Sequence, residues 1–255
     1  MQKRDHSHSQ GRLVVVGIGP GNPLDRTIRA ERAIKESDVV AGYHRYIELV
    51  QDLIVQQKII SSGMTQERQR CARAIESALE GKTVSLISSG DSGIYGMAGL
   101  ALEMIREMDI DLKVEIVPGV SAAQAGAAAL GAPLMLDFAC VSLSDLLVSW
   151  EEIESRLKAL AQADMVTVLY NPKSKKRTWQ IEKTVDIFLR SRPGSTLAGI
   201  VRNASLEQES IVLTNLKDLA EQEMDMRSMV IIGNSRTTRI GSWLVTVRGY
   251  FAEKT

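Results

Sequence analysis

Apolar and polar residues follow two recurring patterns along the chain. Short apolar runs rich in β-branched residues are typical of buried strands, and longer stretches with apolar residues three and four positions apart are typical of helices. Strands are expected at residues 12–16, 38–41, 83–87, 113–117, 138–141, 165–169, 196–201, 210–213, 229–232 and 243–247. Helices are expected at residues 24–35, 65–80, 96–108, 121–130, 150–163 and 177–190. The fold class is therefore predicted to be α/β.

The helical spacing also predicts which side chains face the core. The expected inner residues are Leu24, Ile28 and Ile34 in the first helix, Cys71, Ala72, Ile75 and Leu79 in the second, and Trp179, Val185 and Leu189 in the last. Thr65 is the predicted N-cap of the second helix. The helix at 121–130 is rich in alanine, so it is thin enough to pack closely against either the sheet or a ligand.

The strictness of the alternation changes near residues 131–134. Before this point strands and helices alternate regularly, which predicts an N-terminal α/β domain at 12–133 with a mainly parallel sheet. After it the alternation is looser, which predicts a C-terminal mixed α/β domain at 134–250. The polar stretch at 1–11 is expected to be a disordered tail.

Composition and charge exclude several classes of protein. Lys plus Arg and Asp plus Glu both number 31, so overall charge does not favour nucleic-acid binding or attraction to a membrane surface. No apolar run reaches the roughly 18–20 residues of a membrane helix. The first ten residues lack the apolar core of a secretory signal, so a cytoplasmic protein is expected. The two cysteines and three histidines have no metal-site spacing, so no metal is expected.

Loops of small residues follow many of the predicted strands. They lie at 17–23, 89–96, 118–122, 170–173 and 202–205. In an open α/β sheet, ligands bind at the carboxyl ends of strands, where such loops lie. A site made mainly of backbone groups suits a cofactor with an adenosine and an amino acid. It suits neither metal hydrolysis nor a nucleophilic triad.

Two of these loops and the segment at 42–46 leave alternatives open. The 17–23 loop resembles a dinucleotide fingerprint, but Asn22 replaces its third glycine and Pro20 lacks an N–H, which disfavours a nicotinamide dehydrogenase. The 89–96 loop is either an ordinary βα turn or part of a ligand site, and Asp91 shapes the loop or binds a cofactor. The 42–46 segment, with Tyr43 and Arg45, could hold a flat anionic ligand or form a solvated helix start.

Taken together and in this order, the loop motifs resemble the tetrapyrrole methylase family, whose members methylate corrin and porphyrin precursors with S-adenosylmethionine. The matching motifs are residues 16–21, 90–95, 118–122, 131–134, 170–172 and 202–205, within a region of about 12–249. The broad family usually has proline after the aspartate of the Gly-Asp loop, where this chain has Ser92. That departure resembles the branch that methylates C17 of precorrin-3B or its cobalt-containing counterpart, cobalt-factor III, with ring contraction, in cobalamin biosynthesis.

The resemblance implies two α/β domains with the active site in the cleft between them, a tetrapyrrole substrate, and commonly a homodimer. It implies that S-adenosylmethionine is lined by Pro20, Gly90, Asp91, Ile94, Tyr95, Ser121, Ala122, Tyr170, Asn171, Asn203 and Ala204. The candidate substrate-binding residues are Gly19, Tyr43, Arg45, Ser142, Lys173 and Arg177. Arg45, Lys173 and Arg177 are among them because a substrate with many carboxylates needs local basic groups. A solvated lysine-rich loop is the competing interpretation of 173–177.

In the branch that the chain resembles, methylation accompanies ring contraction, and this implies that a carbonyl or hydroxyl at C20 is polarised or deprotonated. The candidate catalytic residues are Asp145, Ser144 and Tyr95, with Ser142 beside them. Asp145 could instead cap a helix that begins at Leu146. Alternative functions are methylation at C20 or C11 of the macrocycle, or a tetrapyrrole carrier without turnover. No residue of the sequence indicates whether the substrate holds cobalt.

Overall fold

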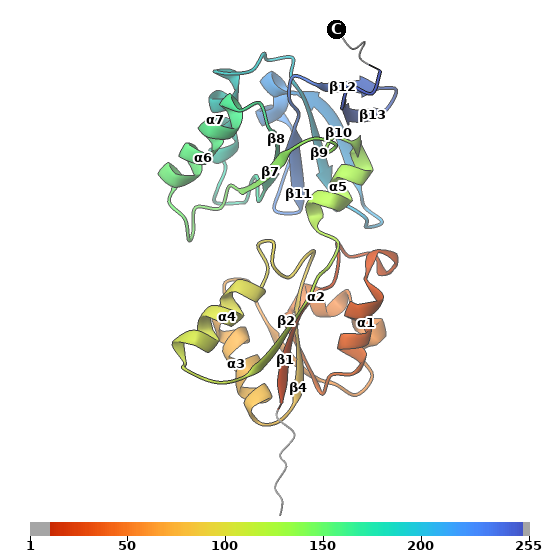
Figure 1. Ribbon diagram of the computed structural model, residues 1–255, viewed down its shortest axis with the longest axis vertical. Coiled ribbons are helices and arrows are strands. Elements are labelled where there is room, and N and C mark those ends of the chain that lie inside the picture. The colour runs from red at the N-terminus through yellow and green to blue at the C-terminus, as the bar shows by residue number, and fades with distance from the viewer. Residues whose placement is uncertain (1–10, 252–255) are drawn as a thin grey trace, which may run out of the picture. The chain divides into compact units, whose positions relative to one another are not determined.

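Two sheets, each covered by helices on both faces, form the core of the protein in the computed structural model, which describes residues 11–251 (Figure 1). The chain divides between Ser121 and Ala122 into two compact units. The expected α/β class is confirmed in both units. Apart from Gly11, which is buried, the tail predicted at 1–11 lies outside the described residues.

The first unit contains a five-stranded sheet in the order β3-β2-β4-β1-β5, and every neighbouring pair is parallel. Its strands are β1 (Arg12–Gly17), β2 (Val39–Tyr43), β3 (Lys58–Ser62), β4 (Thr83–Ser88) and β5 (Lys113–Val117). Its helices are α1 (Ile28–Lys35), α2 (His44–Glu48), α3 (Glu67–Leu79) and α4 (Ala98–Glu107), with 3₁₀ turns at Pro23–Asp25 and Gln51–Leu53. The parallel order brings the carboxyl ends of all these strands to one edge, where the glycine loops lie.

Two apolar layers sandwich this sheet. Residues of β1 that alternate along the strand point to opposite faces: Leu13 and Val15 pack with α3 and α4, whereas Val14 and Val16 pack with α1 and α2. These two pairs of helices lie on opposite sides of the sheet (Figure 1). Strands buried on both faces explain why their sequences are continuously apolar.

The second unit contains a mixed five-stranded sheet in the order β10-β9-β11-β8-β7, in which only the β7–β8 pair is parallel. Its strands are β7 (Phe138–Ser142), β8 (Val166–Tyr170), β9 (Leu197–Arg202), β10 (Ser210–Asn215) and β11 (Ser228–Ile232). A smaller sheet joins β6 (Gly131–Ala132), β12 (Thr237–Ile240) and β13 (Trp243–Thr246). The helices are α5 (Ala122–Leu130), α6 (Trp150–Gln162) and α7 (Gln180–Leu189), with a 3₁₀ turn at Leu216–Glu221.

The alanine-rich helix α5 packs against the sheet. Ala123, Ala127 and Leu130 share an apolar cluster with residues of β8, β9 and β11. A Cβ on Gly126 would lie 1.8 Å from the Met229 side chain, and one on Gly199 would lie 2.5 Å from that of Leu130. The thin helix therefore packs closely against the sheet, which is the first of the two interpretations given for this segment. The division of the chain falls before α5, whereas the sequence places the domain boundary after it.

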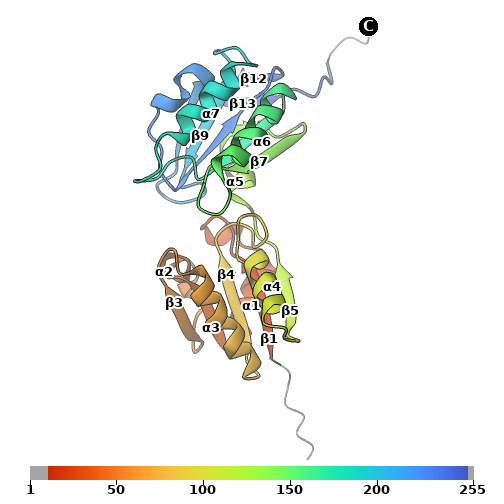
Figure 2. The same ribbon diagram turned by 90° about the vertical axis from the view of Figure 1, so that its left-hand side faces the viewer.

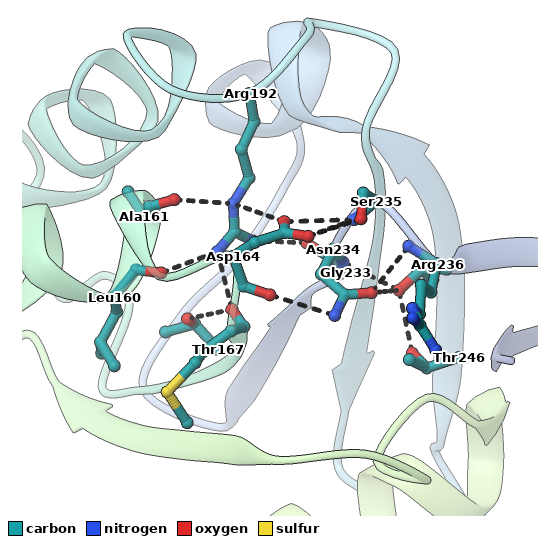
Figure 3. Close-up of polar contacts among 12 residues, drawn as sticks. Leu160, Ala161, Asp164, Thr167, Arg192, Gly233, Asn234, Ser235, Arg236 and Thr246 are labelled. Atoms are coloured by element: carbon teal, nitrogen blue, oxygen red, sulfur yellow. Dashed lines mark hydrogen bonds and ion pairs between the residues drawn. The ribbon is translucent and has the colours of Figure 1, made fainter. Parts of the chain in front are cut away.

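Arg192 links several segments of the second unit (Figure 3). Its buried guanidinium donates to the carbonyl oxygens of Leu160, Ala161, Met165 and Gly233, at 2.9, 3.4, 2.8 and 2.6 Å. The Asp164 carboxylate lies 3.6 Å from its Nε. Burial is the main cause that lowers the pKa of Arg192, and Asp164 opposes it. A buried arginine in this protein can thus have a nearby carboxylate and at least one acceptor for each of its three guanidinium nitrogens.

Several predicted inner faces are wrong. Leu24 and Ile28 are 92% and 80% exposed, because the expected first helix is two elements. Asn22 caps the 3₁₀ turn by accepting from the N–H of Leu24, and Thr27 caps α1 by accepting from that of Ala30. Because α1 begins only at Ile28, Ile28 lies at its exposed first turn, and the buried residues of the helix are Ala30 and Ile34.

Three other side chains of the predicted inner faces are exposed, namely Leu79, Trp179 and Leu189. Each lies within one residue of a helix end, where fewer neighbours cover the side chain. Thr65 is not the N-cap of α3: it has a positive φ of 66°, and Gln66 occupies the cap position without a side-chain hydrogen bond. The sequence analysis also missed the strands β3, β6 and β12, which are short and partly exposed.

Candidate functional site

The glycine loops of the first unit meet one another directly. The backbone N–H of Gly19 donates to the Gly90 carbonyl at 3.1 Å, and the N–H of Gly90 donates to the Gly19 carbonyl at 2.7 Å. Both glycines have positive φ, at 77° and 67°. A Cβ on Gly119 would lie 2.3 Å from the Gly90 carbonyl oxygen, so the third loop also needs glycine where it joins the pair. These glycines serve contacts between loops, and the Gly19 and Gly90 amides are occupied by each other.

Asp91 holds the same cluster together through its carboxylate. Oδ1 accepts from the backbone N–H groups of Gly93 and Ile94 at 2.8 and 3.1 Å, and Oδ2 accepts from that of Gly119 at 3.0 Å. Hydrogen bonds to a charged acceptor are about twice as strong as neutral ones. Asp91 was expected either to shape the loop or to bind a cofactor. Its hydrogen bonds show that it shapes the loops.

Ser92 connects this loop to the end of β5. Its side chain is buried, and its hydroxyl donates to the Val117 carbonyl at 3.0 Å. Its own carbonyl accepts from the N–H of Ala98 at 2.9 Å, at the start of α4. Proline at this position could not make the side-chain bond, so the residue that departs from the broad family pattern has a distinct structural role.

The tip of the Gly-Asp loop presents apolar and aromatic surface. Ile94 and Tyr95 are both exposed, and Tyr95 has a positive φ of 53°. A bulky residue in the left-handed region is uncommon and strained, and such strain is found more often at functional sites. Pro20 is half-buried and Ser121 is buried. The first unit thus presents the exposed ring of Tyr95 on a loop whose backbone is held by the hydrogen bonds of Asp91.

Tyr43 and Tyr46 lie at the carboxyl end of β2 and in the first turn of α2. Their rings are in edge contact with centroids 5.2 Å apart, and the Tyr43 and His44 rings lie 4.3 Å apart. Burial is the main cause that raises the pKa of the Tyr46 phenol, so it is a neutral hydrogen-bonding group at physiological pH. Arg45 is exposed.

The loops of the second unit are joined by side-chain hydrogen bonds. Ser142 Oγ accepts from the Asn171 side-chain amide at 3.0 Å and from the Ser144 N–H at 3.2 Å. Tyr170 Oη accepts from the N–H of Ala123 at 3.0 Å, which satisfies a donor at the start of α5. Asn171 has a positive φ of 51°. These contacts bring together four residues predicted from the sequence, Ser142, Ser144, Tyr170 and Asn171, beside the start of α5, where Ala122 lies.

Asp145 does not cap a helix. The next helix, α6, begins at Trp150 with Ser149 as its N-cap, and Leu146 and Leu147 are exposed in the intervening loop. Asp145 Oδ2 instead accepts from Gln180 Nε2 at 2.9 Å, and Gln180 is buried at the start of α7. Gln180 is a partner that sequence reasoning missed, because the two residues are far apart along the chain.

Arg177 lies inside the second unit. It is only 8% exposed, and its Nη2 donates to the Asn171 carbonyl at 3.3 Å and contacts Met226 Sδ at the same distance. Burial lowers the pKa of Arg177, and the charge of Asp145 partly opposes this. The interpretation of 173–177 as a solvated loop is therefore wrong for Arg177. Lys175 and Lys176 are exposed, and Lys173 is half-buried.

Asn203 follows β9 in a left-handed conformation with φ of 52°. Its N–H donates to the Arg227 carbonyl at 3.1 Å, and its side-chain amide donates to the Gln208 carbonyl at 3.1 Å. These bonds fix a tight turn in which Ala204 is half-buried. The predicted residues therefore form one group at the strand ends of each unit, and within residues 11–251 no group of His, Cys, Asp or Glu is arranged to hold a metal.

The helices of the described region include none long and apolar enough to cross a membrane.

Comparison with known proteins adds to this geometry. Residues 12–220 match the model of the family described as Tetrapyrrole (Corrin/Porphyrin) Methylases.

Two curated relatives and one solved structure are similar over most of the chain. A Salmonella typhimurium protein named "Probable cobalt-factor III C(17)-methyltransferase" is 42% identical over 93% of this chain and 99% of its own length. A Priestia megaterium protein named "Cobalt-factor III methyltransferase" is 46% identical over 94% of this chain, which spans only 45% of that longer protein. The crystal structure of the methyltransferase CobJ superposes with a TM-score of 0.87 at 32% identity, over 93% of this chain and 100% of that one.

The match to the family model and the relative that matches over nearly its full length agree with the motifs found in the sequence. On this basis the chain belongs to the tetrapyrrole (corrin/porphyrin) methylase family.

Proposed function

We propose that the protein transfers a methyl group from S-adenosylmethionine to C17 of cobalt-factor III, or of its cobalt-free counterpart precorrin-3B, with contraction of the macrocycle. The observation that carries the proposal is the similarity to the Salmonella typhimurium protein of that name along nearly the whole of both chains. The fixed glycine loops and the buried Ser92 support it, because they are the parts of the chain on which that assignment depends.

The predicted cofactor residues fit an S-adenosyl group. In the first unit, Pro20, Ile94 and Tyr95 offer partly exposed apolar surface over a rigid loop base, which suits an adenine ring or a methionyl chain. In the second unit, Asn171 and Asn203 hold left-handed turns that hydrogen bonds fix, and Tyr170, Ala122 and Ala204 are the other predicted cofactor residues of that unit. Gly90, Asp91 and Ser121 shape the loops that carry the contacts. When bound, the cofactor supplies a methyl group on a sulfonium, which is already a good leaving group.

The protein's contribution to such a transfer is mainly positioning. Correct proximity and orientation of two reactants can lower a barrier by about 7–11 kcal/mol. Hydrogen bonds that cross between loops hold the strand ends within each unit, those of Asp91 in the first unit and those of Ser142 in the second. They reduce motion of the loops that would disturb the alignment of the reactants.

Asp145 is the proposed proton acceptor in ring contraction. Gln180 donates to Oδ2 and thereby orients the carboxylate, so that Oδ1 can accept a proton from an oxygen at C20. Ser142 Oγ already accepts two hydrogen bonds, so its hydroxyl can contribute to a further hydrogen bond only as a donor. Ser144 and Tyr95 are proposed to contribute further hydroxyl donors.

Substrate carboxylates are proposed to contact Arg45, Lys173 and Arg177, with Gly19, Tyr43 and Ser142 against the macrocycle. The buried guanidinium of Arg177 is suited to paired contacts with a carboxylate.

We also propose a homodimer, which size-exclusion chromatography with light scattering would test directly.

The decisive experiment incubates the protein with S-adenosylmethionine and either cobalt-factor III or precorrin-3B. Product mass reports methylation, and the absorption spectrum reports contraction of the macrocycle. We expect one added methyl at C17, identified by NMR of the product, together with the spectral change. Methylation at C20 or C11 would replace the proposal with a different regiospecificity. Tight cofactor and tetrapyrrole binding without any methyl transfer would indicate a carrier.

A further inference from the structure

Arg70, on α3, is a buried cation that has no counter-ion among residues 11–251. It is 4% exposed, and none of the ion pairs in that range includes it. Its strongest hydrogen bond runs from Nη1 to Ser62 Oγ at 2.6 Å, with a weaker one to the Gly63 carbonyl at 3.4 Å. Its Nε–H is buried and has no hydrogen-bond partner in the described part of the chain. Burying a charge is costly unless it is paired, so this arrangement needs an explanation.

Arg192 provides the internal comparison. That guanidinium has acceptors for Nε, Nη1 and Nη2 and a carboxylate beside it, as expected of an arginine whose role is structural (Figure 3). Arg70 instead meets, at Nη2, only the thioether of Met97, with Sδ at 3.8 Å. A thioether is a weak acceptor on a flexible side chain, so it can be replaced at little cost.

The place of Arg70 in the fold is at the ligand-binding edge of the first sheet. Ser62 ends β3, and the parallel register places it opposite Tyr43 at the end of β2. The helices α2 and α3 both contact β3 at this edge (Figure 2). Met97 directly follows the Gly-Asp loop. Arg70 therefore lies between the segment predicted to bind substrate, 42–46, and the loop predicted to bind the cofactor, 89–96.

The surrounding charges leave the guanidinium cationic and unneutralised. Burial lowers the pKa of Arg70, and this is only partly opposed by Glu67 and the Tyr46 phenol. The Glu67 carboxylate is directed to the backbone N–H of Thr65, to which Oε1 lies at 3.2 Å, and forms no ion pair with Arg70. An anion that reached this edge would thus meet a desolvated positive charge with free N–H groups.

We propose that Arg70 binds a carboxylate of the substrate, with Met97 moving aside to admit it. The ligand class is a macrocycle bearing carboxylate side chains, and the inference rests on the proposed function for the identity of that macrocycle. The Nε–H and one Nη2–H form the pair of parallel donors that a carboxylate takes. The contact would fix one edge of the macrocycle between Tyr43 and the Gly-Asp loop.

The test measures equilibrium binding of cobalt-factor III by absorbance titration, with S-adenosylhomocysteine present so that no turnover occurs. Arg70→Met is compared with Arg70→Lys and with Arg68→Met, which removes an exposed arginine from the same helix. We expect Arg70→Met to weaken tetrapyrrole binding roughly 10- to 100-fold, the loss of a charge-assisted contact. Arg70→Lys should lose less because it retains the charge, and Arg68→Met should bind as the unaltered protein does. Should Arg70→Met fail to fold, the Lys variant carries the comparison.

The affinity for S-adenosylhomocysteine and the methyl-transfer assay separate the possible outcomes. Unchanged tetrapyrrole affinity in both Arg70 variants, with methylation intact, would overturn the inference and leave the proposed function standing. If the unaltered protein binds the tetrapyrrole but never methylates it, and a correctly folded Arg70 variant binds it more weakly, the inference about Arg70 stands and the proposed function is overturned. An equal loss of S-adenosylhomocysteine affinity would assign Arg70 to support of the Gly-Asp loop instead. No tetrapyrrole binding by the unaltered protein would overturn both.

Discussion

The Asp91 carboxylate accepts a hydrogen bond from the backbone N–H of Gly119 at 3.0 Å, and this bond joins the loop after β4 to the loop after β5. The two strands are not adjacent, because β1 lies between them. The same carboxylate also holds the N–H groups of Gly93 and Ile94. One side chain therefore fixes the relative position of two loops in which many of the predicted cofactor residues lie.

Replacing Asp91 with asparagine should loosen this junction. The variant keeps one acceptor oxygen but turns an NH₂ group toward a backbone donor, so at least one N–H loses its partner. We expect a stability loss of about 1–3 kcal/mol in chemical denaturation, the contribution of a hydrogen bond to a charged group, because the N–H groups involved are exposed or only partly buried. Affinity for S-adenosylhomocysteine, measured by calorimetry, should fall at least about tenfold if the loop shape is needed for binding. Unchanged affinity in a destabilised variant would restrict Asp91 to a purely structural role.

Two glycine-to-alanine changes should have opposite effects. In Gly119→Ala the new Cβ would lie 2.3 Å from the Gly90 carbonyl oxygen, so the loops must separate. In Gly99→Ala, on the exposed face of α4, nothing lies within 4 Å of the new Cβ. We expect Gly119→Ala to lower the melting temperature and cofactor affinity, and Gly99→Ala to stabilise by about 0.5–1 kcal/mol, since alanine is the better helix former. Equal melting temperatures would contradict the packing described for the three loops.

Asp145 and Gln180 should act together in turnover. Asp145→Asn removes the proposed proton acceptor, and Gln180→Ala removes the group that orients it. We expect slower ring contraction in both, with a larger loss, about 10²–10⁴-fold, for Asp145→Asn, the usual contribution of acid–base catalysis. Ser144→Ala should have a smaller effect. Product spectra and single-turnover rates are the measurements, and near-normal contraction in Asp145→Asn and Ser144→Ala would remove both residues from the mechanism.

The buried thiol of Cys71 predicts a pH dependence of stability. Burial raises its pKa to about 11, compared with 9.0 for an ordinary thiol. The folded state therefore holds this proton more tightly, and its contribution to stability is fully present below pH 9 and is lost as the pH rises through 11. The unfolding free energy of Cys71→Ala should consequently fall less steeply than that of the unaltered protein between pH 8.5 and 11, as measured by denaturant titration at several pH values. Parallel slopes would show that Cys71 is not protected.

The sequence by itself determined the fold class, the family and most of the elements. Apolar runs such as that of β1 record burial on both faces of a sheet, and the glycine loops recur because close backbone contacts tolerate no side chain. The family assignment followed from the order of these loops. Helix faces were predicted less well, because caps such as Asn22 and Thr27 restart the helix and rotate its buried side.

Only the tertiary structure decided which side chains serve the loops and which are left unpaired. The bonds from Asp91 to Gly119, Ser92 to Val117 and Gln180 to Asp145 each join residues at least 25 positions apart, so no local pattern encodes them. The same holds for Arg70. Its helical spacing marks it only as one polar residue of α3. The burial of its charge, without a counter-ion among residues 11–251, depends on its contacts with β3 and Met97. Local propensity and periodicity are written in neighbouring residues, but the burial and pairing of a charge depend on segments that meet only when the chain folds.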